Sequence, residues 1–378
     1  MEDSIHIEFL EDVDKFTNEE IRPYTTKFEE EQKIPRSLIE KLAERGYLAA
    51  SFPKEYGGLG LNPVQYGLFT EVIGKACAST RAILTVHTSL VGETILRCGT
   101  DHQKKELLPK MAKGEILTAF ALSEPNIGTD AKGVETVYTT NGESYIINGK
   151  KKWITLSGIA DLFLVIANGE PGISAIFVDS KSKGVKVTPI RGLLAGRSAY
   201  ISEIEFNNVI VPKENLLGKE GQGFTYIVNT ALDFGRYSIA WGGLGIAQEA
   251  MEQMVNYSRN RKQFGRSLYS NQLIQGMLGD SVTKIHAGRA LCLRAGEYRI
   301  KNNQDAIVET TIAKYYTSKI AMEIAIDAVQ IHGGNGCCNQ YPVERLFREA
   351  KILEIIEGTS QVQQEIISRF GLRRYYNV

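Results

Sequence analysis

The stretch EIIEGTSQVQQ (residues 354–364) places a carboxylate in an apolar run just before a predicted helix start. Ser360 and Gln363 have the spacing of a capping box, which predicts a helix beginning at about Ser360. Glu357 would then lie near the positive end of that helix, where a negative charge or an oxyanion is stabilised. The apolar neighbours Ile355 and Ile356 would raise its proton affinity, as removal of a carbon-bound proton requires. The alternative for an isolated Glu is a helix cap without chemistry, so the rest of the chain has to decide.

Composition excludes several classes of protein. The chain has 378 residues, which suits two or three packed domains, and its 44 basic and 44 acidic residues give zero formal net charge. That balance argues against nucleic-acid and membrane partners. The five cysteines form no C-x-x-C pair and the five histidines show no metal-ligand spacing. No signal peptide and no membrane-spanning run is visible, so the sequence predicts a cytoplasmic, metal-free globular protein.

The pattern of apolar residues divides the chain into three regions. Residues 1 to about 117 show helical periodicity, and short alternating runs rich in β-branched residues begin at about residue 118. The dipeptides Asn141-Gly142 and Asn148-Gly149 predict hairpin turns between these strands. From about residue 221 the chain is again helical, with long segments expected over 224–260, 271–301, 305–334 and 340–369. The fold class is therefore mainly α with a central β domain, and no G-x-G-x-x-G follows a strand to suggest a Rossmann site.

The segments IEGTSQ (356–361), QIHGGNG (330–336) and YPVER (341–345) resemble, at the same spacing, the acyl-CoA dehydrogenase family of flavoproteins. The resemblance extends along nearly the whole chain. It implies an N-terminal helical domain (1–117), a middle β-barrel (118–220) and a C-terminal four-helix bundle (221–378). It also implies FAD as cofactor, a homo-oligomer (dimer or tetramer), and Glu357 as the base that removes the α-proton of a thioester while a hydride leaves for the flavin.

The same resemblance implies two groups of cofactor-binding residues. The first group comes from an E-P-x-x-G-(S/T)-D segment and a W-I-T motif, and consists of Phe120, Leu122, Ser123, Gly128, Thr129, Trp153 and Thr155. The second group would meet the pyrophosphate and adenosine of a flavin held mainly by an adjacent subunit, or lie beside the base: Arg261, Gln263, Phe264, Asn271, Gln272, Gln330, Gly333, Gly334, Thr359 and Gln361. Without the resemblance, the structural alternatives are a turn, a core Trp and a basic helix end. Residues 156–158 depart from the family's usual N-G continuation.

Substrate contacts are implied at Thr129, Asp233, Arg236, Tyr237 and Gly358. Asp233 and Arg236 lie three apart on a predicted helix, so a surface ion pair is the alternative. Arg236 would support Glu357 or hold an anionic acyl group.

Four stretches resemble a narrower branch, the carrier-protein-dependent dehydrogenases of antibiotic biosynthesis: 231–248, 313–316, 327–337 and 354–358. This likeness implies a glyceryl- or seryl-derived substrate on an acyl carrier protein, on the way to a hydroxymalonyl, methoxymalonyl or aminomalonyl polyketide extender unit. One alternative is a short-chain acyl-CoA dehydrogenase that desaturates a CoA thioester. The electron acceptor would be an electron-transfer flavoprotein or oxygen. A second alternative is a flavin-free scaffold that only binds an acyl carrier.

Overall fold

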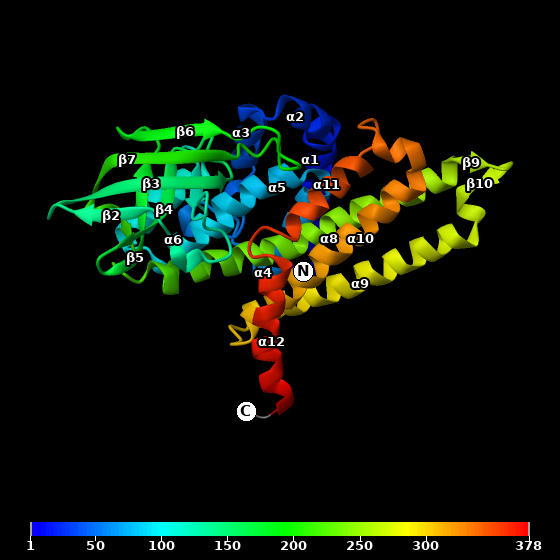
Figure 1. The fold of residues 1–378 in the computed structure, drawn as a ribbon. Helices are drawn as coiled ribbons and strands as arrows, with labels where there is room; N and C mark the ends of the chain where they lie inside the picture. The colour runs from blue at the N-terminus through cyan, green and yellow to red at the C-terminus, as the bar shows by residue number, and fades with distance from the viewer. Residues whose placement is uncertain (1, 377–378) are drawn as a thin grey trace. The chain divides into compact units, whose positions relative to one another are not determined.

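The computed structural model describes residues 2–376, which fold into two compact units (Figure 1). The helical unit contains the residues up to Glu30, Asn62–Arg81 and the residues from Arg236 on. The sheet unit contains Glu31–Leu61 and Ala82–Gly235. Among the residues described, no helix is both long and apolar enough to cross a bilayer.

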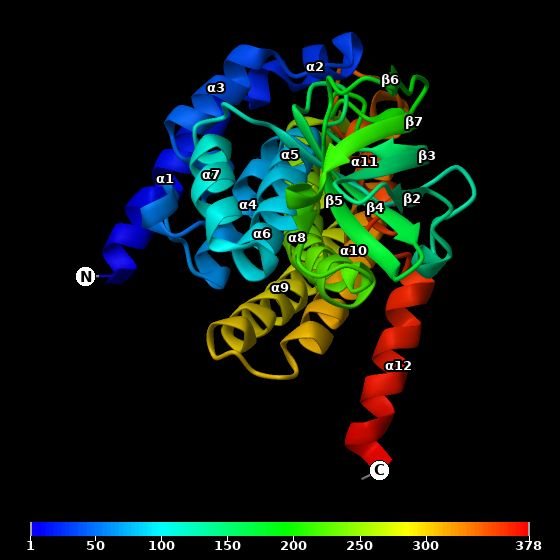
Figure 2. The ribbon, with the colours of Figure 1, turned by 90° about the vertical axis from the view of Figure 1, so that its left-hand side faces the viewer.

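Long helices build the helical unit. Those lying wholly or mostly in it are α1 (Glu2–Glu20), α2 (Thr25–Glu31), α4 (Pro63–Ala76), α5 (Ala78–Leu84), α8 (Asn229–Asn260), α9 (Gln272–Ile300), α10 (Ala306–His332), α11 (Val343–Leu353) and α12 (Ser360–Tyr376). A short hairpin, β9 (Lys262–Gln263) and β10 (Arg266–Ser267), joins α8 to α9. Figures 1 and 2 show α12 running out from the other helices of this unit.

Glycines on α8 allow neighbouring helices to approach closely. A Cβ atom at Gly243 would lie 3.0 Å from the Thr317 backbone on α10, and one at Gly245 would lie 2.7 Å from the Glu71 carbonyl oxygen on α4. The core around this contact contains the fully buried Leu244 of α8 and Ile324 of α10. The apolar residues spread around α8 and α10 are thus explained by burial on several sides.

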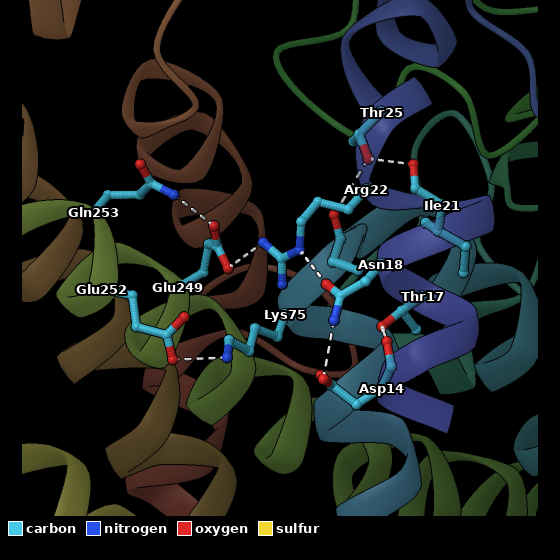
Figure 3. A network of polar contacts seen from close by, with 11 residues as sticks. Asp14, Thr17, Asn18, Ile21, Arg22, Thr25, Lys75, Glu249, Glu252 and Gln253 are labelled. Carbon is cyan, nitrogen blue, oxygen red and sulfur yellow. Dashed lines mark hydrogen bonds and ion pairs between the residues drawn. The ribbon is translucent and has the colours of Figure 1, made fainter. Parts of the chain in front are cut away.

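A polar network between α8 and the chain around the end of α1 satisfies a carboxylate inside the helical unit (Figure 3). Arg22 Nη1 donates to Glu249 Oε2 at 2.6 Å, and Gln253 Nε2 donates to Glu249 Oε1 at 2.9 Å. Arg22 Nε donates to Asn18 Oδ1 at 3.0 Å. Because Glu249 is almost fully buried, its charge needs these partners to offset the lost hydration.

The sheet unit combines short helices with eight strands. Its helices are α3 (Arg36–Glu44), α6 (Glu93–Cys98) and α7 (Asp101–Ala112), with a π-helical segment at Thr85–Gly92. Its strands are β1 (Thr118–Ala121), β2 (Val137–Thr140), β3 (Ser144–Ile154), β4 (Leu162–Gly169), β5 (Gly172–Asp179), β6 (Val185–Pro189), β7 (Ser202–Pro212) and β8 (Leu216–Leu217). They form one sheet in the order β6-β7-β3-β2-β4-β5-β8, with β1 paired to β4.

Most strand pairs are antiparallel, as expected, but β1 and β2 pair with β4 in parallel. Asn141-Gly142 forms the predicted turn between β2 and β3, where Asn141 Oδ1 accepts from the Ser144 amide. The turn predicted at Asn148-Gly149 is wrong, because both residues lie inside β3 beside a register shift. A Cβ at Gly149 would approach Thr136 to 2.5 Å, so close backbone contact, rather than a chain reversal, requires this glycine.

The prediction of one continuous helix over residues 340–369 is also wrong. The structure divides it into α11 and α12, separated by a turn at residues 354–359. Glu357 and Gly358 both have left-handed backbone angles there, which an α-helix does not tolerate.

Candidate functional site

The turn between α11 and α12 presents Glu357. Glu357 has φ 55° and Gly358 has φ 91°. A left-handed non-glycine residue costs about 1 kcal/mol or more, so the surroundings must hold Glu357 in place. The capping box predicted from Ser360 and Gln363 does not form. Thr359 Oγ1 instead accepts from the Val362 amide at 3.3 Å.

Three side chains hold the backbone of this turn. Arg236 Nε donates to the Glu357 carbonyl oxygen at 3.0 Å, and Lys314 Nζ donates to the Gly358 carbonyl oxygen at 2.8 Å. Gln363 Nε2 donates to both carbonyl oxygens, at 3.1 and 3.0 Å. Arg236 comes from α8, Lys314 from α10 and Gln363 from α12, so three helices of the helical unit fix Glu357 through its main chain.

One oxygen of the Glu357 carboxylate differs from the backbone of the turn in having no such partner. This atom, Oε2, is buried and makes no hydrogen bond within the described chain, although the residue as a whole is partly exposed. Burial raises the pKa of Glu357 to about 7, while the charges of Arg236, Lys314 and Arg81 act in the opposite direction. A carboxylate with this proton affinity and a free oxygen can accept a proton near neutral pH.

The apolar neighbours contribute less than expected. Ile355 is half exposed, so it does not bury Glu357, whereas Ile356 packs against the hydrophobic core of the helical unit. The raised pKa follows from the burial of the carboxylate itself.

The residues expected beside Glu357 differ in the contacts that they make. Arg236 reaches the Glu357 backbone through its Nε atom. Tyr237 is buried, and its hydroxyl already donates to the Pro63 carbonyl oxygen at 2.8 Å. Burial raises the pKa of the Tyr237 hydroxyl, so it stays protonated. Of these candidates, Arg236 is the one that the structure brings to Glu357.

In the sheet unit, two predicted flavin segments lie side by side. Phe120 and Leu122 are buried at and after the end of β1, and the Lys152 amide donates to the Ser123 carbonyl oxygen at 2.8 Å. Trp153, at the end of β3, is not a core residue: 52% of its side chain is exposed, and its φ is 63°. A strained, exposed indole suits stacking on a planar ligand.

A fully buried ion pair supports this segment. Lys151 Nζ lies 2.7 Å from Glu124 Oε1 and donates to the Leu122 carbonyl oxygen at 3.0 Å. The Glu135 and Thr136 amides donate to Glu124 at 2.6 and 2.9 Å. Burial raises the pKa of Glu124, but the Lys151 charge and the hydrogen bonds outweigh it and lower the pKa. The ion pair and hydrogen bonds of Glu124 therefore fix the loop that carries Ser123, Gly128 and Thr129.

The other predicted cofactor residues are mostly solvent-exposed. Exposed positions include Thr129 and Gly128 in the sheet unit, and Arg261, Gln263, Gln272, Gln330, Gly333, Gly334 and Gln361 in the helical unit, while Thr155, Asn271 and Thr359 are partly buried. A Cβ at Gly333 or Gly334 would meet open space, so backbone there is accessible to a ligand. Phe264 is fully exposed at the tip of the β9–β10 hairpin, with φ 51°.

Sequence reasoning missed Lys314, Gln363 and Lys151. A signal was available for Lys314, which follows Ala313 within an expected apolar helix, whereas Lys151 lies in a run of three lysines and is not distinguished from its neighbours. The sequence predicts Gln363 as part of a local helix cap, and its spacing gives no indication of the contacts with two carbonyl oxygens. Among the described residues no cluster of His, Cys, Asp and Glu could hold a metal ion.

Comparison with known proteins assigns the family. Residues 4–115 match the N-terminal domain of acyl-CoA dehydrogenases, residues 119–209 the middle domain and residues 221–372 the C-terminal domain. The chain belongs to the acyl-CoA dehydrogenase family. The predicted helical, β and helical order is thus confirmed, and the protein is an FAD-dependent oxidoreductase that acts on CH–CH groups.

Several members of this family are similar over their full length. The short-chain-specific acyl-CoA dehydrogenase of Clostridium acetobutylicum is 39% identical, over 94% of this chain and 95% of that protein. The caffeyl-CoA reductase–Etf complex subunit CarC of Acetobacterium woodii is 36% identical, over 92% of each chain. The butyryl-CoA dehydrogenase structure from Megasphaera elsdenii has a TM-score of 0.93 at 35% identity, covering 98% of both chains.

The narrower branch is not singled out by these comparisons. The structure of FkbI, which serves biosynthesis of the methoxymalonyl extender unit of Fk520, has a TM-score of 0.89 at 28% identity, covering 95% of this chain and 99% of that chain. Short-chain acyl-CoA dehydrogenases are more similar than this. The family expectation is confirmed, whereas the extender-unit expectation is not specifically supported.

Proposed function

We propose that this protein is a short-chain acyl-CoA dehydrogenase that introduces an α,β double bond into a CoA thioester. Glu357 takes the proton from Cα, and the hydrogen on Cβ leaves as a hydride with its electron pair. FAD, when bound, would supply the acceptor for this hydride. The observation that carries the proposal is the unbonded, buried Oε2 of Glu357, held in a strained turn among three cationic side chains.

The protein's own residues each have a defined task in this proposal. Arg236 and Gln363 hold the Glu357 peptide, which fixes the point and direction at which the side chain leaves the backbone. Burial favours uptake of the proton, and the nearby cations keep enough of the carboxylate ionised at neutral pH to act as a base.

We propose that FAD is bound by the candidate residues that are accessible in each unit. In the sheet unit, the exposed Trp153 ring would cover the flavin, with Thr155 and the loop residues Ser123, Gly128 and Thr129 at its polar edge. Phe120 and Leu122 are buried, so they would contribute main-chain atoms. In the helical unit the exposed backbone at Gly333 and Gly334 and the guanidinium of Arg261 suit a pyrophosphate or adenosine. The remaining candidates there are Gln263, Phe264, Asn271, Gln272, Gln330, Thr359 and Gln361.

An anaerobic thioester panel tests the substrate. Butyryl-CoA, hexanoyl-CoA and octanoyl-CoA are mixed with the FAD-loaded protein, and loss of flavin absorbance is followed by stopped flow. We expect fastest reduction by butyryl-CoA, as the similarity to short-chain enzymes suggests. No reduction by any acyl-CoA would overturn the proposal.

A second candidate is a substrate carried on an acyl carrier protein, which the likeness to FkbI favours. Glyceryl- and seryl-derived carrier-protein thioesters belong in the same panel. Reduction by these thioesters and not by butyryl-CoA would establish the second candidate. The flavin-free scaffold loses its basis, because the family is FAD-dependent.

We propose an electron-transfer flavoprotein as the electron acceptor, since the similar CarC is a subunit of a complex with Etf. Turnover with a purified electron-transfer flavoprotein and a terminal dye, compared with turnover in oxygen alone, distinguishes the two predicted acceptors.

We also propose a homo-oligomer. Phe264 is fully exposed and 86% of Leu273 is exposed, both in the helical unit, and a second copy of the chain would cover such apolar side chains. Light scattering after size-exclusion chromatography separates a monomer from a dimer or tetramer.

A further inference from the structure

Lys314 is buried in α10 with a single acceptor. Its side chain has no exposed surface, and within the described chain its ammonium donates one hydrogen bond, to the Gly358 carbonyl oxygen at 2.8 Å. Burying a lysine is costly, and an apolar side chain of similar length would fill the same space without that cost. The position of the charge therefore calls for an explanation beyond packing.

The charged groups around Glu357 come from four elements. Arg236 lies on α8, Lys314 on α10 and Arg81 on α5, and all three lower the proton affinity of the carboxylate. Glu354, in the turn after α11, acts on Lys314 together with Glu357. Burial lowers the pKa of Lys314 to about 8, and the Glu357 charge opposes that shift. Lys314 and Glu357 therefore influence one another's protonation.

The Lys314 ammonium influences Glu357 without a hydrogen bond to the carboxylate oxygen Oε2. Lys314 and Arg236 bond to the backbone carbonyls of residues 358 and 357, while Glu357 Oε2 has no hydrogen bond within the described residues. If a cation paired directly with the carboxylate, it would block the oxygen that has to receive the proton. Bonding through the main chain keeps the positive charge close and leaves that oxygen available.

We propose that Lys314 is a positioning residue for the proton transfer: its ammonium fixes the left-handed Glu357–Gly358 turn and keeps the Glu357 carboxylate ionised near neutral pH. This inference rests on the proposed function of Glu357 as the base. It assigns Lys314 a role through Glu357, without contact to the substrate.

The test compares Lys314→Met, Lys314→Gln and Lys314→Arg with Lys319→Met, a control on an exposed position of the same helix. The protonation of Glu357 is measured without substrate, as the carboxyl infrared band that titrates in the parent protein and is missing in Glu357→Gln. The pH profile of flavin reduction by butyryl-CoA is measured in parallel. Melting temperature and bound FAD establish that each variant is folded and loaded.

Removing the Lys314 charge should raise the pKa of Glu357 by about one unit or more in Lys314→Met and Lys314→Gln, because an opposite charge is lost nearby. The reduction rate at pH 7 should then fall about fivefold or more and recover towards pH 9. Lys314→Arg should largely restore both readouts, and Lys319→Met should leave them unchanged. Lys314→Gln keeps a hydrogen-bond donor, so it serves if Lys314→Met fails to fold.

An unchanged infrared titration in folded, uncharged Lys314 variants would overturn the inference. A loss of rate by the same factor at every pH would also overturn it, because a purely structural role predicts that result. If the parent protein reduces its flavin with none of the thioesters, the proposed function fails, while the infrared titration still decides the role of Lys314.

Discussion

Two glutamates with buried carboxylate oxygens have opposite environments in this protein. Glu124, in the sheet unit, is paired with Lys151 and accepts two backbone amides, and its pKa is lowered. Glu357, in the helical unit, has a buried oxygen without a hydrogen bond, and its pKa is raised to about 7. Both have lysines nearby, but Lys151 bonds to the carboxylate and Lys314 bonds to the backbone. A cation placed on the carboxylate makes a structural ion pair, whereas a cation placed on the peptide leaves a base that can react.

The largest expected effect is on catalysis by Glu357→Gln. Loss of the base should slow flavin reduction by butyryl-CoA ~10²–10⁴-fold, while FAD stays bound because the amide keeps the shape of the side chain. Stopped-flow bleaching measures the rate and the absorbance spectrum measures the FAD. Glu365→Gln, on an exposed position of α12, is the control. A loss of less than tenfold would remove Glu357 from the role of base.

Breaking the Glu124–Lys151 ion pair should lower the free energy of unfolding. Lys151→Met leaves Glu124 buried without its cation, which should cost about 3–5 kcal/mol of unfolding free energy. Lys150→Met, next to it, removes a surface pair at 3.6 Å from Glu205 and should cost under about 1 kcal/mol. Urea unfolding curves compare the two variants. Equal losses in both would contradict the contrast between the two glutamates.

The pH dependence of flavin reduction should follow the ionisation of Glu357. Only the carboxylate form accepts the proton, so the rate rises with pH through about 7. Between pH 6 and pH 8 the increase should be about tenfold, with a slope of one proton. A pH series of single-turnover reductions measures it, with FAD retention checked at each pH. A flat profile across this window would show that a different group, or a different step, limits the reaction.

The smallest expected effect is on the way the free energy of unfolding changes with pH. Because the folded pKa of Glu357 is raised from 4.5 to about 7, its contribution is most favourable below pH 4.5 and is lost as pH rises to 7. Glu357→Gln lacks this loss, so its stability relative to the parent should increase by about 1–3 kcal/mol between pH 4.5 and pH 8. The buried Glu349, whose pKa is also raised to about 7 by burial, is present in both proteins and cancels. Urea unfolding at the two pH values provides the measurement.

Sequence patterns predicted the helical and β regions and the turn at Asn141-Gly142, because these depend on local periodicity and turn chemistry. They failed at Asn148-Gly149, where the glycine is required by contact with Thr136 on another part of the sheet unit. Glu357 was singled out from its motif. Its partners Arg236 and Lys314 lie 121 and 43–44 residues away in the chain, and the contacts that hold the turn form only when three helices pack together.

The contact around Gly358 limits how this turn can change. A β carbon there would lie 2.8 Å from Gln363 Nε2, in a backbone conformation that side chains disfavour. A side chain at position 358 would be strained and would displace the Gln363 amide, so a change of residue 357 or of the cations that bond to the main chain is the less disruptive route to another reaction. For enzyme engineering, this makes 357 the attachment point for a different catalytic side chain on a scaffold whose geometry is already fixed.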